Sequence, residues 1–242
     1  MQKDNPLYES SYNTIKKSAL FRSLNSELLH KILEKFTIYC WKKNETIDYE
    51  LCDKYCFFIV EGRIKMTQVD PKTGRSIAPF LLSSGDIFDV ITLLDEKEHI
   101  VFPITIDNIV ALAMPLNDAR ELISKYPQLN QQFLPYLGKL MRHLEEFGTS
   151  MVFYDTVTRL ANLILKHTFS HKDSNTKEHK VKLINNLSHE SIAELVGSVR
   201  SVITLQLQKL KDEDIILHKR GEIAISNLEK LIRKIDHLHC KK

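Results

Sequence analysis

The sequence predicts an α+β fold in which a strand-rich first half precedes a helical second half. Between residues 37 and 115, short runs rich in Ile, Val, Phe and Thr alternate with turns, which is typical of a barrel or sandwich. A long segment with an apolar seven-residue repeat follows Pro127, and short amphipathic helices follow it. With 242 residues, 43% of them apolar, the chain is long enough for two domains with proper cores.

The first half is expected to contain one helix and then strands. Residues 14–36 are predicted to be helical from Leu24 on, because apolar side chains there recur at helical spacing. Residues 70–74, DPKTG, have the composition of a hairpin loop. The expected strands are residues 37–41, 55–62, 63–69, 76–82, 86–94 and 108–115.

The segment after Pro127 predicts a long helix that packs along a second helix. Its apolar residues fall seven apart in two series, which form one seam. The seam favours a subunit contact in a homodimer, and the alternative is a helix lying on its own domain. Pro135, Gly138 and Gly148 are poor helix formers, so the helix is expected to start late or bend. The expected dimer-interface residues are Phe133, Leu137, Leu140, Leu144, Phe147 and Met151.

The charge of the chain is unevenly distributed. Residues 156–242 contain 16 Lys and Arg against 10 Asp and Glu, whereas residues 1–155 contain 18 against 21. A basic last third favours a polyanionic partner, although an uneven, solvated surface would have the same composition. Within this third, residues 155–169 predict an amphipathic helix and residues 170–180 a surface loop.

Residues 188–210 predict two short helices joined by a tight turn. Ser188 is a natural N-cap for the first helix, and Gly197 can adopt the left-handed backbone that ends it. The second helix is expected to bury Val199, Ile203, Leu207 and Leu210. Because neither helix can bury its apolar stripe alone, the pair predicts a helix-turn-helix, whose second helix enters the major groove of DNA. The alternative is a helical hairpin that contacts protein.

The residues that follow predict a winged helix. Residues 215–226 form a strand, a turn at 219–221 and a second strand, and residues 226–238 a closing helix capped by Ser226. Arg pairs with guanine and Gln with adenine, whereas Ser, Thr and Lys more often contact the phosphate backbone. His218 is also expected to contact phosphate. The expected residues that bind double-stranded DNA are Ser198, Val199, Arg200, Ser201, Thr204, Gln208, Lys219 and Arg220.

At this point the chain resembles the Crp/Fnr family of bacterial transcription regulators. The matching segments, in order, are LFRSLNSELL, WKKNETI, FFIVEGRIKM, LLSSGDIFDV, MVFYDTVTRLANLILKHT and IAELVGSVRSVITLQLQKLKDEDII. The resemblance implies a double-stranded, jelly-roll-like β-roll over 1–115, a long dimerisation helix over 116–154 and a C-terminal winged helix-turn-helix over 155–242. It also implies a cytoplasmic homodimer that acts on near-palindromic promoter sites, with RNA polymerase as a further partner.

The departures from the family pattern argue against cyclic-nucleotide control. Gly85 and Asp86 match the turn of members that bind cyclic AMP, but the position of their ribose-binding Glu falls on Val90. The Arg-Ser pair that holds the cyclic phosphate falls on Ile100 and Val101. In the second helix, Arg200 matches the usual base-reading Arg, Ser201 replaces a common Glu, Leu205 stands where a second Arg is common, and Val199 replaces a capping Ser.

The cysteines leave a redox role open. Residues 1–39 contain no cysteine, unlike the iron–sulfur branch of the family. Cys40, Cys52 and Cys56 are predicted structural thiols, with a thiol-based or iron–sulfur sensor as the alternative. No metal site is expected, including at His237, His239 and Cys240. No cofactor or catalytic motif, membrane span or secretory signal is expected, so the sequence predicts neither an enzyme nor a membrane protein. Regulation by a different small ligand in the β-roll, by thiols or by abundance stays open.

Overall fold

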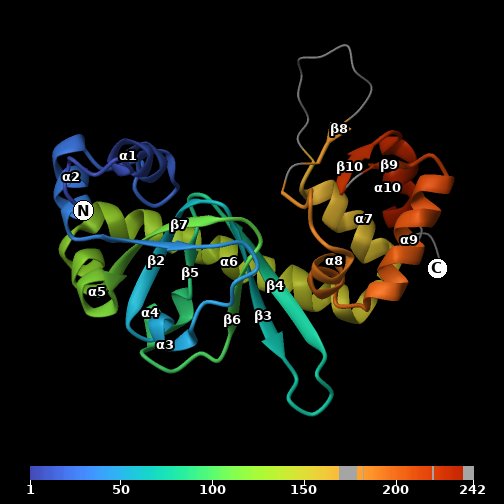
Figure 1. Ribbon diagram of the computed structural model, residues 1–242, viewed down its shortest axis with the longest axis horizontal. Helices are drawn as coiled ribbons and strands as arrows, with labels where there is room; N and C mark the ends of the chain where they lie inside the picture. Colours follow the sequence, from blue (N-terminus) through green and yellow to red (C-terminus); the bar gives the residue numbers. More distant parts are fainter. Residues whose placement is uncertain (169–178, 182, 220, 237–242) are drawn as a thin grey trace. The chain divides into compact units, whose positions relative to one another are not determined.

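The computed structural model describes residues 1–168, 179–181, 183–219 and 221–236 (Figure 1). The chain divides into two compact units. The first unit comprises Met1–Thr73 and Pro79–Leu144, and the second comprises Gly74–Ala78 and Glu145–Lys242. No described helix is both long and apolar enough to cross a membrane.

Two sheets form a β-roll, which lies in the first unit except for the start of β4, as the resemblance implied. One has the strand order β1-β7-β2-β5 and the other the order β4-β3-β6. The strands are β1 (Thr37–Trp41), β2 (Tyr55–Glu61), β3 (Arg63–Val69), β4 (Ser76–Ser83), β5 (Ile87–Phe88), β6 (Phe102–Thr105) and β7 (Ile109–Pro115). The DPKTG stretch joins β3 to β4, which are neighbours in their sheet, so the hairpin prediction is confirmed.

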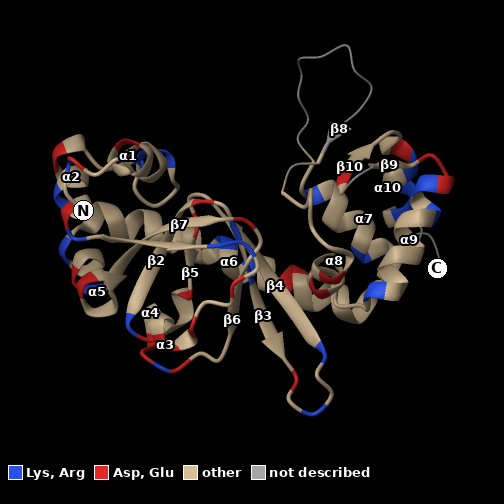
Figure 2. Cartoon of the chain, in the orientation of Figure 1, with Lys and Arg blue, Asp and Glu red and all other residues tan. Residues whose placement is uncertain are grey.

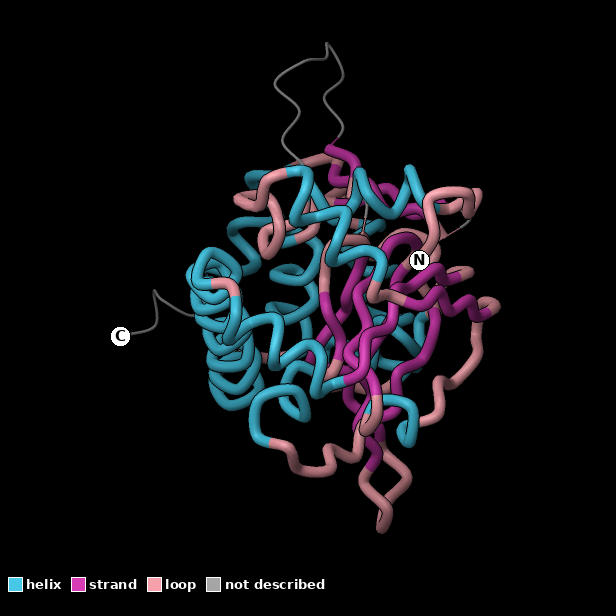
Figure 3. The backbone as a smooth tube through the Cα atoms, turned by 90° about the vertical axis from the view of Figure 1, so that its left-hand side faces the viewer, coloured by secondary structure: helices cyan, strands magenta, loops and turns pink. Residues whose placement is uncertain are grey.

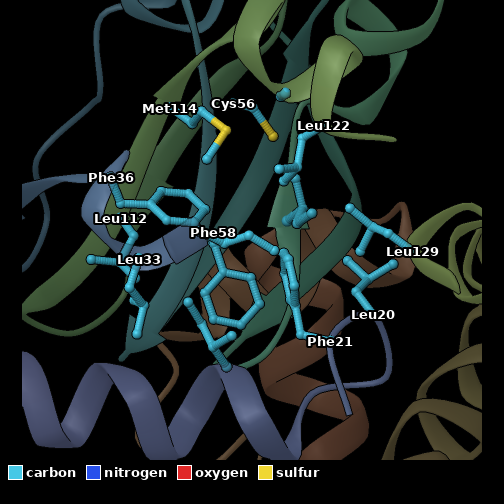
Figure 4. Packing of buried hydrophobic residues seen from close by; sticks show 14 of the residues in the cluster. Leu20, Phe21, Leu33, Phe36, Cys56, Phe58, Leu112, Met114, Leu122 and Leu129 are labelled. Atoms are coloured by element: carbon cyan, nitrogen blue, oxygen red, sulfur yellow. The ribbon is translucent and has the colours of Figure 1, made fainter. Parts of the chain in front are cut away.

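The central strands divide their side chains between two cores, because successive residues of a strand point to opposite faces. Cys56 and Phe58 of β2 pack in a helix-side core together with residues from α1 (Tyr8–Lys17), α2 (Ser26–Glu34) and α5 (Leu116–Lys125). Phe57 and Ile59 enter an inter-sheet core with residues of β3 and β7. Figure 4 shows the helix-side core around Phe58, where side chains from strands and helices meet.

The first half differs from the prediction in four elements: one predicted strand is mostly wrong, and three elements were missed. Helix α1 was not expected, although the helix predicted from Leu24 on is confirmed as α2, capped by Asn25. The strand expected over 86–94 is limited to β5 and is followed by helix α4 (Val90–Asp95). The switch occurs at Asp89, whose left-handed backbone (φ 57°) ends the strand. Strand β6 was also missed, as was the short helix α3 (Tyr49–Cys52).

Helix α6 (Pro127–Phe153) has 27 residues and starts at Pro127, not later as expected. Proline suits a first helical position, since the missing N–H would have no intrahelical partner there. Pro135 lies inside the helix without ending it. The first turns of α6 bury Leu129, Phe133 and Tyr136 in the helix-side core.

The second unit contains the predicted winged helix. Its elements are α7 (Thr156–Lys166), β8 (His179–Lys180), α8 (His189–Val196), α9 (Arg200–Asp212), β9 (Ile216–Lys219), β10 (Glu222–Ile225) and α10 (Leu228–Asp236). The three strands form one sheet of order β8-β10-β9, so the last two residues of the loop expected over 170–180 are a strand, while most of that loop lies outside the described residues. Figure 3 distinguishes these helices from the strands by colour.

Candidate nucleic-acid interface

The turn between α8 and α9 has the local geometry that the sequence predicts. The Ser188 hydroxyl accepts a hydrogen bond from the Ser191 backbone N–H at 3.0 Å and so caps α8. Gly197 takes the left-handed conformation at φ 67°, and the Ser198 N–H donates to the Ala193 carbonyl at 2.8 Å. These bonds satisfy both ends of α8 within a short segment, and they direct the chain into α9.

One face of α9 anchors it to the second unit. Ile203, Leu207 and Leu210 are buried, as predicted from their spacing. Val199, which was expected on this face, is 47% exposed, and that prediction is wrong. The reason is its position: Val199 is the N-cap residue, with an extended backbone, so it precedes the helical periodicity that the other three follow.

The outward face of α9 carries most of the predicted DNA-binding side chains. Arg200, Ser201, Thr204 and Gln208 are all exposed, and Ser198 is half-buried in the turn before them. Within the described residues, the Arg200 guanidinium has no hydrogen-bond or ion-pair partner, so all its donors are available to a ligand. The Thr204 hydroxyl lies 2.8 Å from His189 Nδ1, and the Gln208 amide donates to Asp212 at 2.7 Å. Basic residues lie along this unit (Figure 2).

The predicted wing is an antiparallel hairpin. Lys219 of β9 pairs with Glu222 of β10, which leaves two residues for the turn, and the Lys219 backbone therefore lies at the tip. Arg220 lies outside the described residues. The ring of His218 is 5.6 Å from that of His189, and burial, followed by the His189 and Lys211 charges, lowers the pKa of His218. A lowered pKa favours the neutral ring, so His218 is better suited to hydrogen bonding than to acting as a cation.

A residue that sequence reasoning missed connects the turn to the preceding helix. Arg159 donates to the Tyr154 carbonyl at 2.9 Å, just after the end of α6, and to the Gly197 carbonyl at 3.3 Å. Asp155 caps α7 by accepting from the Thr158 N–H at 2.8 Å. The only sequence signal for a role of Arg159 is that this cation stands between Thr158 and Leu160, which α7 buries.

The residues predicted to form the dimer seam differ in burial and in what they pack against. Phe133 is buried in the helix-side core of its own unit, and Leu137 and Leu140 pack partly against that core. The Met151 side chain lies against the turn, since a Cβ added to Gly197 would be 2.5 Å from its sulfur. Phe147 is half-buried and Leu144 is exposed. Large apolar side chains that project into solvent from α6 also include Leu134, Met141, Val152 and Phe153.

A cavity of about 370 Å³ lies in the first unit, against α6. Its lining is mostly apolar and includes Val90 and Val101, two positions where cyclic-nucleotide-binding members carry polar recognition groups. Ile100 projects into solvent instead. The polar lining residues include Asp89 and His99, whose carboxylate and ring nitrogen are 2.8 Å apart. The hydrogen bond to Asp89, opposed by burial, raises the pKa of His99.

The candidate redox thiols occupy two environments. Cys52 and Cys56 are buried, and burial raises the pKa of each to about 12, so both are protonated and unreactive at neutral pH. Cys40 is exposed on β1. These three thiols are free. Among the residues that the structure describes, no three His, Cys, Asp or Glu side chains are grouped so as to hold a metal ion.

A β-roll, a long helix and a winged helix with an exposed polar reading face together define a DNA-binding transcription regulator. Residues 158–234 match the Crp-like helix-turn-helix domain model. The described second unit therefore contains a Crp-like helix-turn-helix domain, and the relatives and solved structures that follow support the resemblance to the Crp/Fnr family of bacterial transcription regulators.

Two curated relatives and two solved structures illustrate this similarity. A global nitrogen regulator of Synechocystis sp. is 24% identical over 216 residues, which cover 87% of this chain and 91% of the relative. A CRP-like cAMP-activated global transcriptional regulator of Mycobacterium tuberculosis is 22% identical over 178 residues, covering 74% and 78%. A CooA mutant from Carboxydothermus hydrogenoformans has a TM-score of 0.72 at 19% identity, covering 90% and 96%. The c-di-GMP-responsive regulator CLP of Xanthomonas campestris has a TM-score of 0.69 at 13% identity, covering 84% and 100%.

Proposed function

We propose that the chain acts as a homodimer that binds near-palindromic double-stranded DNA and regulates transcription there, with RNA polymerase as a further partner. The observation that carries the proposal is the outward face of α9, where the Arg200 guanidinium has no partner among the described residues and lies beside three other polar side chains. Ile203 and Leu207 anchor the opposite face of the helix. Two such helices related by a twofold axis would read half-sites one helical turn apart, about 34 Å. A non-DNA-binding adaptor is not favoured.

The dimer contact is proposed to use the exposed apolar side of α6. Leu134, Met141 and Leu144 project from this helix into solvent. Packing against a second copy of the helix would remove the free-energy cost of exposing these apolar side chains to water. Gly138 and Gly148 have open space where a Cβ would be, so they would allow close approach of a partner backbone. Sedimentation of Met141→Glu against the original chain tests the contact, because a buried charge there would shift the dimer toward monomer.

Arg200 is proposed to read a guanine in each half-site. Replacing Arg200 with Ala should reduce discrimination at one base pair by about 1–3 kcal/mol, because a bidentate pair with guanine O6 and N7 is lost. Lys209→Ala, which removes an exposed cation from the same helix, should instead weaken all duplexes alike and reduce the salt slope. Gel-shift titrations of a duplex library at two salt concentrations measure both quantities. If Arg200→Ala kept its preference among duplexes, the assignment would be wrong.

The cavity of the first unit is proposed to bind an effector that is mainly apolar and bears one hydrogen-bonding group, and not a cyclic nucleotide. Val90 and Val101 supply no partner for a ribose or a phosphate, whereas His99 can donate to a neutral acceptor. The cavity is bounded by Leu140 and Met141 of α6, so occupancy would act on the helix proposed as the dimer contact. With Cys52 and Cys56 protonated, a switch at these two thiols is less favoured.

A thermal-shift experiment tests this effector class. A panel of medium-chain alcohols and phenols should contain compounds that stabilise the chain, whereas cyclic AMP should not. Val101→Phe should abolish the stabilisation by filling the cavity, and Ile100→Phe, at the exposed neighbouring residue, should leave it intact. Stabilisation by cyclic AMP at micromolar concentration would contradict the proposal.

A further inference from the structure

The outward face of α9 contains one large apolar side chain among its polar residues. Leu205 is 54% exposed, whereas Leu207, two residues further along the same helix, is 1% exposed. Leu205 follows Ser201 by four residues and precedes Gln208 by three, so at 3.6 residues per turn the three side chains form one line along the helix. Leu205 therefore lies in the middle of the proposed base-reading surface and not at its edge.

The chemistry of this position differs from that of its neighbours. A Leu side chain has no donor or acceptor, so a guanine or cytosine facing it would lose water from its polar major-groove edge without gaining a hydrogen bond. In the major groove the one apolar group that a base presents is the 5-methyl group of thymine. An exposed aliphatic side chain on a recognition helix is thus complementary to thymine and unfavourable for a G·C pair.

We propose that Leu205 is a specificity-determining residue that selects thymine in each half-site through its 5-methyl group. The inference rests on the proposed DNA-binding function and names the ligand more closely. The target half-site combines a guanine contacted by Arg200 with a T·A pair that faces Leu205, at the position where the family commonly uses a second Arg. Neighbouring Ser201 and Gln208 supply polar contacts on either side of the methyl group.

The test removes one thymine methyl group at a time from the DNA. Wild-type chain first selects its half-site from a randomised duplex library. Each selected thymine is then replaced by uracil, which keeps Watson–Crick pairing and removes only the methyl group. One thymine per half-site should give a loss of about fourfold in affinity, the effect of one buried methyl group. At that position Leu205→Ala should bind the thymine and uracil duplexes equally.

Two further measurements separate methyl recognition from a general loss of contact. Replacing the same T·A pair by 5-methylcytosine·G should be tolerated better than replacing it by unmethylated C·G, because the methyl group returns. Leu217→Ala, which truncates an exposed Leu on β9, should keep the full thymine-to-uracil effect. Because Leu205 is exposed, Leu205→Ala is expected to keep the circular dichroism spectrum of the wild type.

The outcomes distinguish this inference from the function on which it rests. If the library yields no selected sequence, the proposed DNA binding fails and the inference fails with it. If a sequence is selected but no uracil replacement weakens wild-type binding, Leu205 does not read a methyl group. The same conclusion follows if Leu205→Ala remains as sensitive to uracil as the wild type, and the exposed Leu then serves another contact.

Discussion

The β-roll and the winged helix use their side chains in different ways. Strand β2 is buried on both faces, with Phe58 in the helix-side core and Phe57 in the inter-sheet core. Helix α9 is buried on one face only, so Ser201 and Leu205 are free of packing constraints. The effector proposed for the first unit would therefore occupy a cavity whose walls are partly core, whereas the base preference proposed for the second unit could change with little effect on stability.

The largest expected effect compares two leucines of α9. Leu207→Ala should lower the free energy of unfolding of the second unit by about 2–5 kcal/mol, because it opens a cavity in a small core. Leu205→Ala should change it by less than about 0.5 kcal/mol. Urea unfolding followed by far-ultraviolet circular dichroism measures both variants.

The single tryptophan provides an internal control for this comparison. Trp41 lies on β1 in the first unit and packs against Phe57, so its fluorescence reports the β-roll. The fluorescence transition should have the same midpoint in both variants. Equal losses of stability in Leu205→Ala and Leu207→Ala would contradict the division of α9 into a packed face and a free face.

The next effect concerns two glycines with the same positive φ. Gly197 and Gly74 both have φ 67°, where a side chain costs about 1–2 kcal/mol. Nothing lies within 4 Å of a Cβ added to Gly74, whereas one added to Gly197 would meet the Met151 sulfur at 2.5 Å. Gly197→Ala should therefore destabilise the chain more than Gly74→Ala in urea unfolding.

A double variant separates the two contributions at Gly197. Adding Met151→Ala to Gly197→Ala removes the steric contribution and leaves the conformational one. The Ala substitution at Gly197 should then cost no more than the one at Gly74. If its cost were unchanged in the Met151→Ala background, the contact between the end of α6 and the turn would not restrict this position.

The parts of the molecule that the sequence predicted best are those specified by local signals. Helix α8 has its N-cap at Ser188 and its end at Gly197, and both signals lie within a few residues of the elements that they delimit. Helix α4 was missed because it starts at a left-handed Asp89, a non-glycine residue held partly by a contact ten residues further along the chain. The Asp89 carboxylate binds both the Thr92 hydroxyl at 2.7 Å and His99 at 2.8 Å, and the apolar composition of residues 86–94 does not predict the contact to His99.

In the candidate site, too, features specified by local signals were predictable and those that depend on non-local contacts were not. The exposed positions of α9 were predictable from helical periodicity, since the buried positions determine which side chains face outward. The exposure of Val199 was not, because the helix begins one residue later than the apolar spacing suggested. The roles of Arg159 and of Met151 depend on contacts made across the second unit, which no local pattern encodes.

A smaller effect is expected at the start of α10. Ser226 was predicted to cap this helix. The structure uses Asn227, whose side chain accepts from the Lys230 N–H at 2.9 Å, while the Ser226 hydroxyl donates to the Asp214 carbonyl at 2.7 Å. The prediction for Ser226 is therefore wrong.

Alanine substitutions should rank these two residues. Asn227→Ala should cost about 1 kcal/mol of stability through the loss of the cap, and Ser226→Ala should cost less, because it removes one exposed hydrogen bond. Urea unfolding of the two variants makes the comparison. A greater loss in Ser226→Ala would show that the link to Asp214 matters more than the cap.

The smallest expected effect is on the pH dependence of stability, which should have opposite signs in the two units. The hydrogen bond to Asp89 raises the pKa of His99, so the stability from this pair is fully present below the unfolded pKa, about 6.5. It is lost as the pH rises through the folded pKa. Burial lowers the pKa of His218, so the second unit loses stability as the pH falls from about 6.5 through the folded pKa.

Titration of histidine ring protons by nuclear magnetic resonance measures these shifts, with His99→Gln and His218→Gln used for assignment. His99 should titrate above and His218 below the ordinary value for histidine. Asp89→Asn should lower the pKa of His99 and leave that of His218 unchanged, because the two rings belong to separate units. A common pKa for both rings would mean that the polar pair in the cavity wall is not formed in solution, and the cavity would then lack the hydrogen-bonding group assigned to its effector.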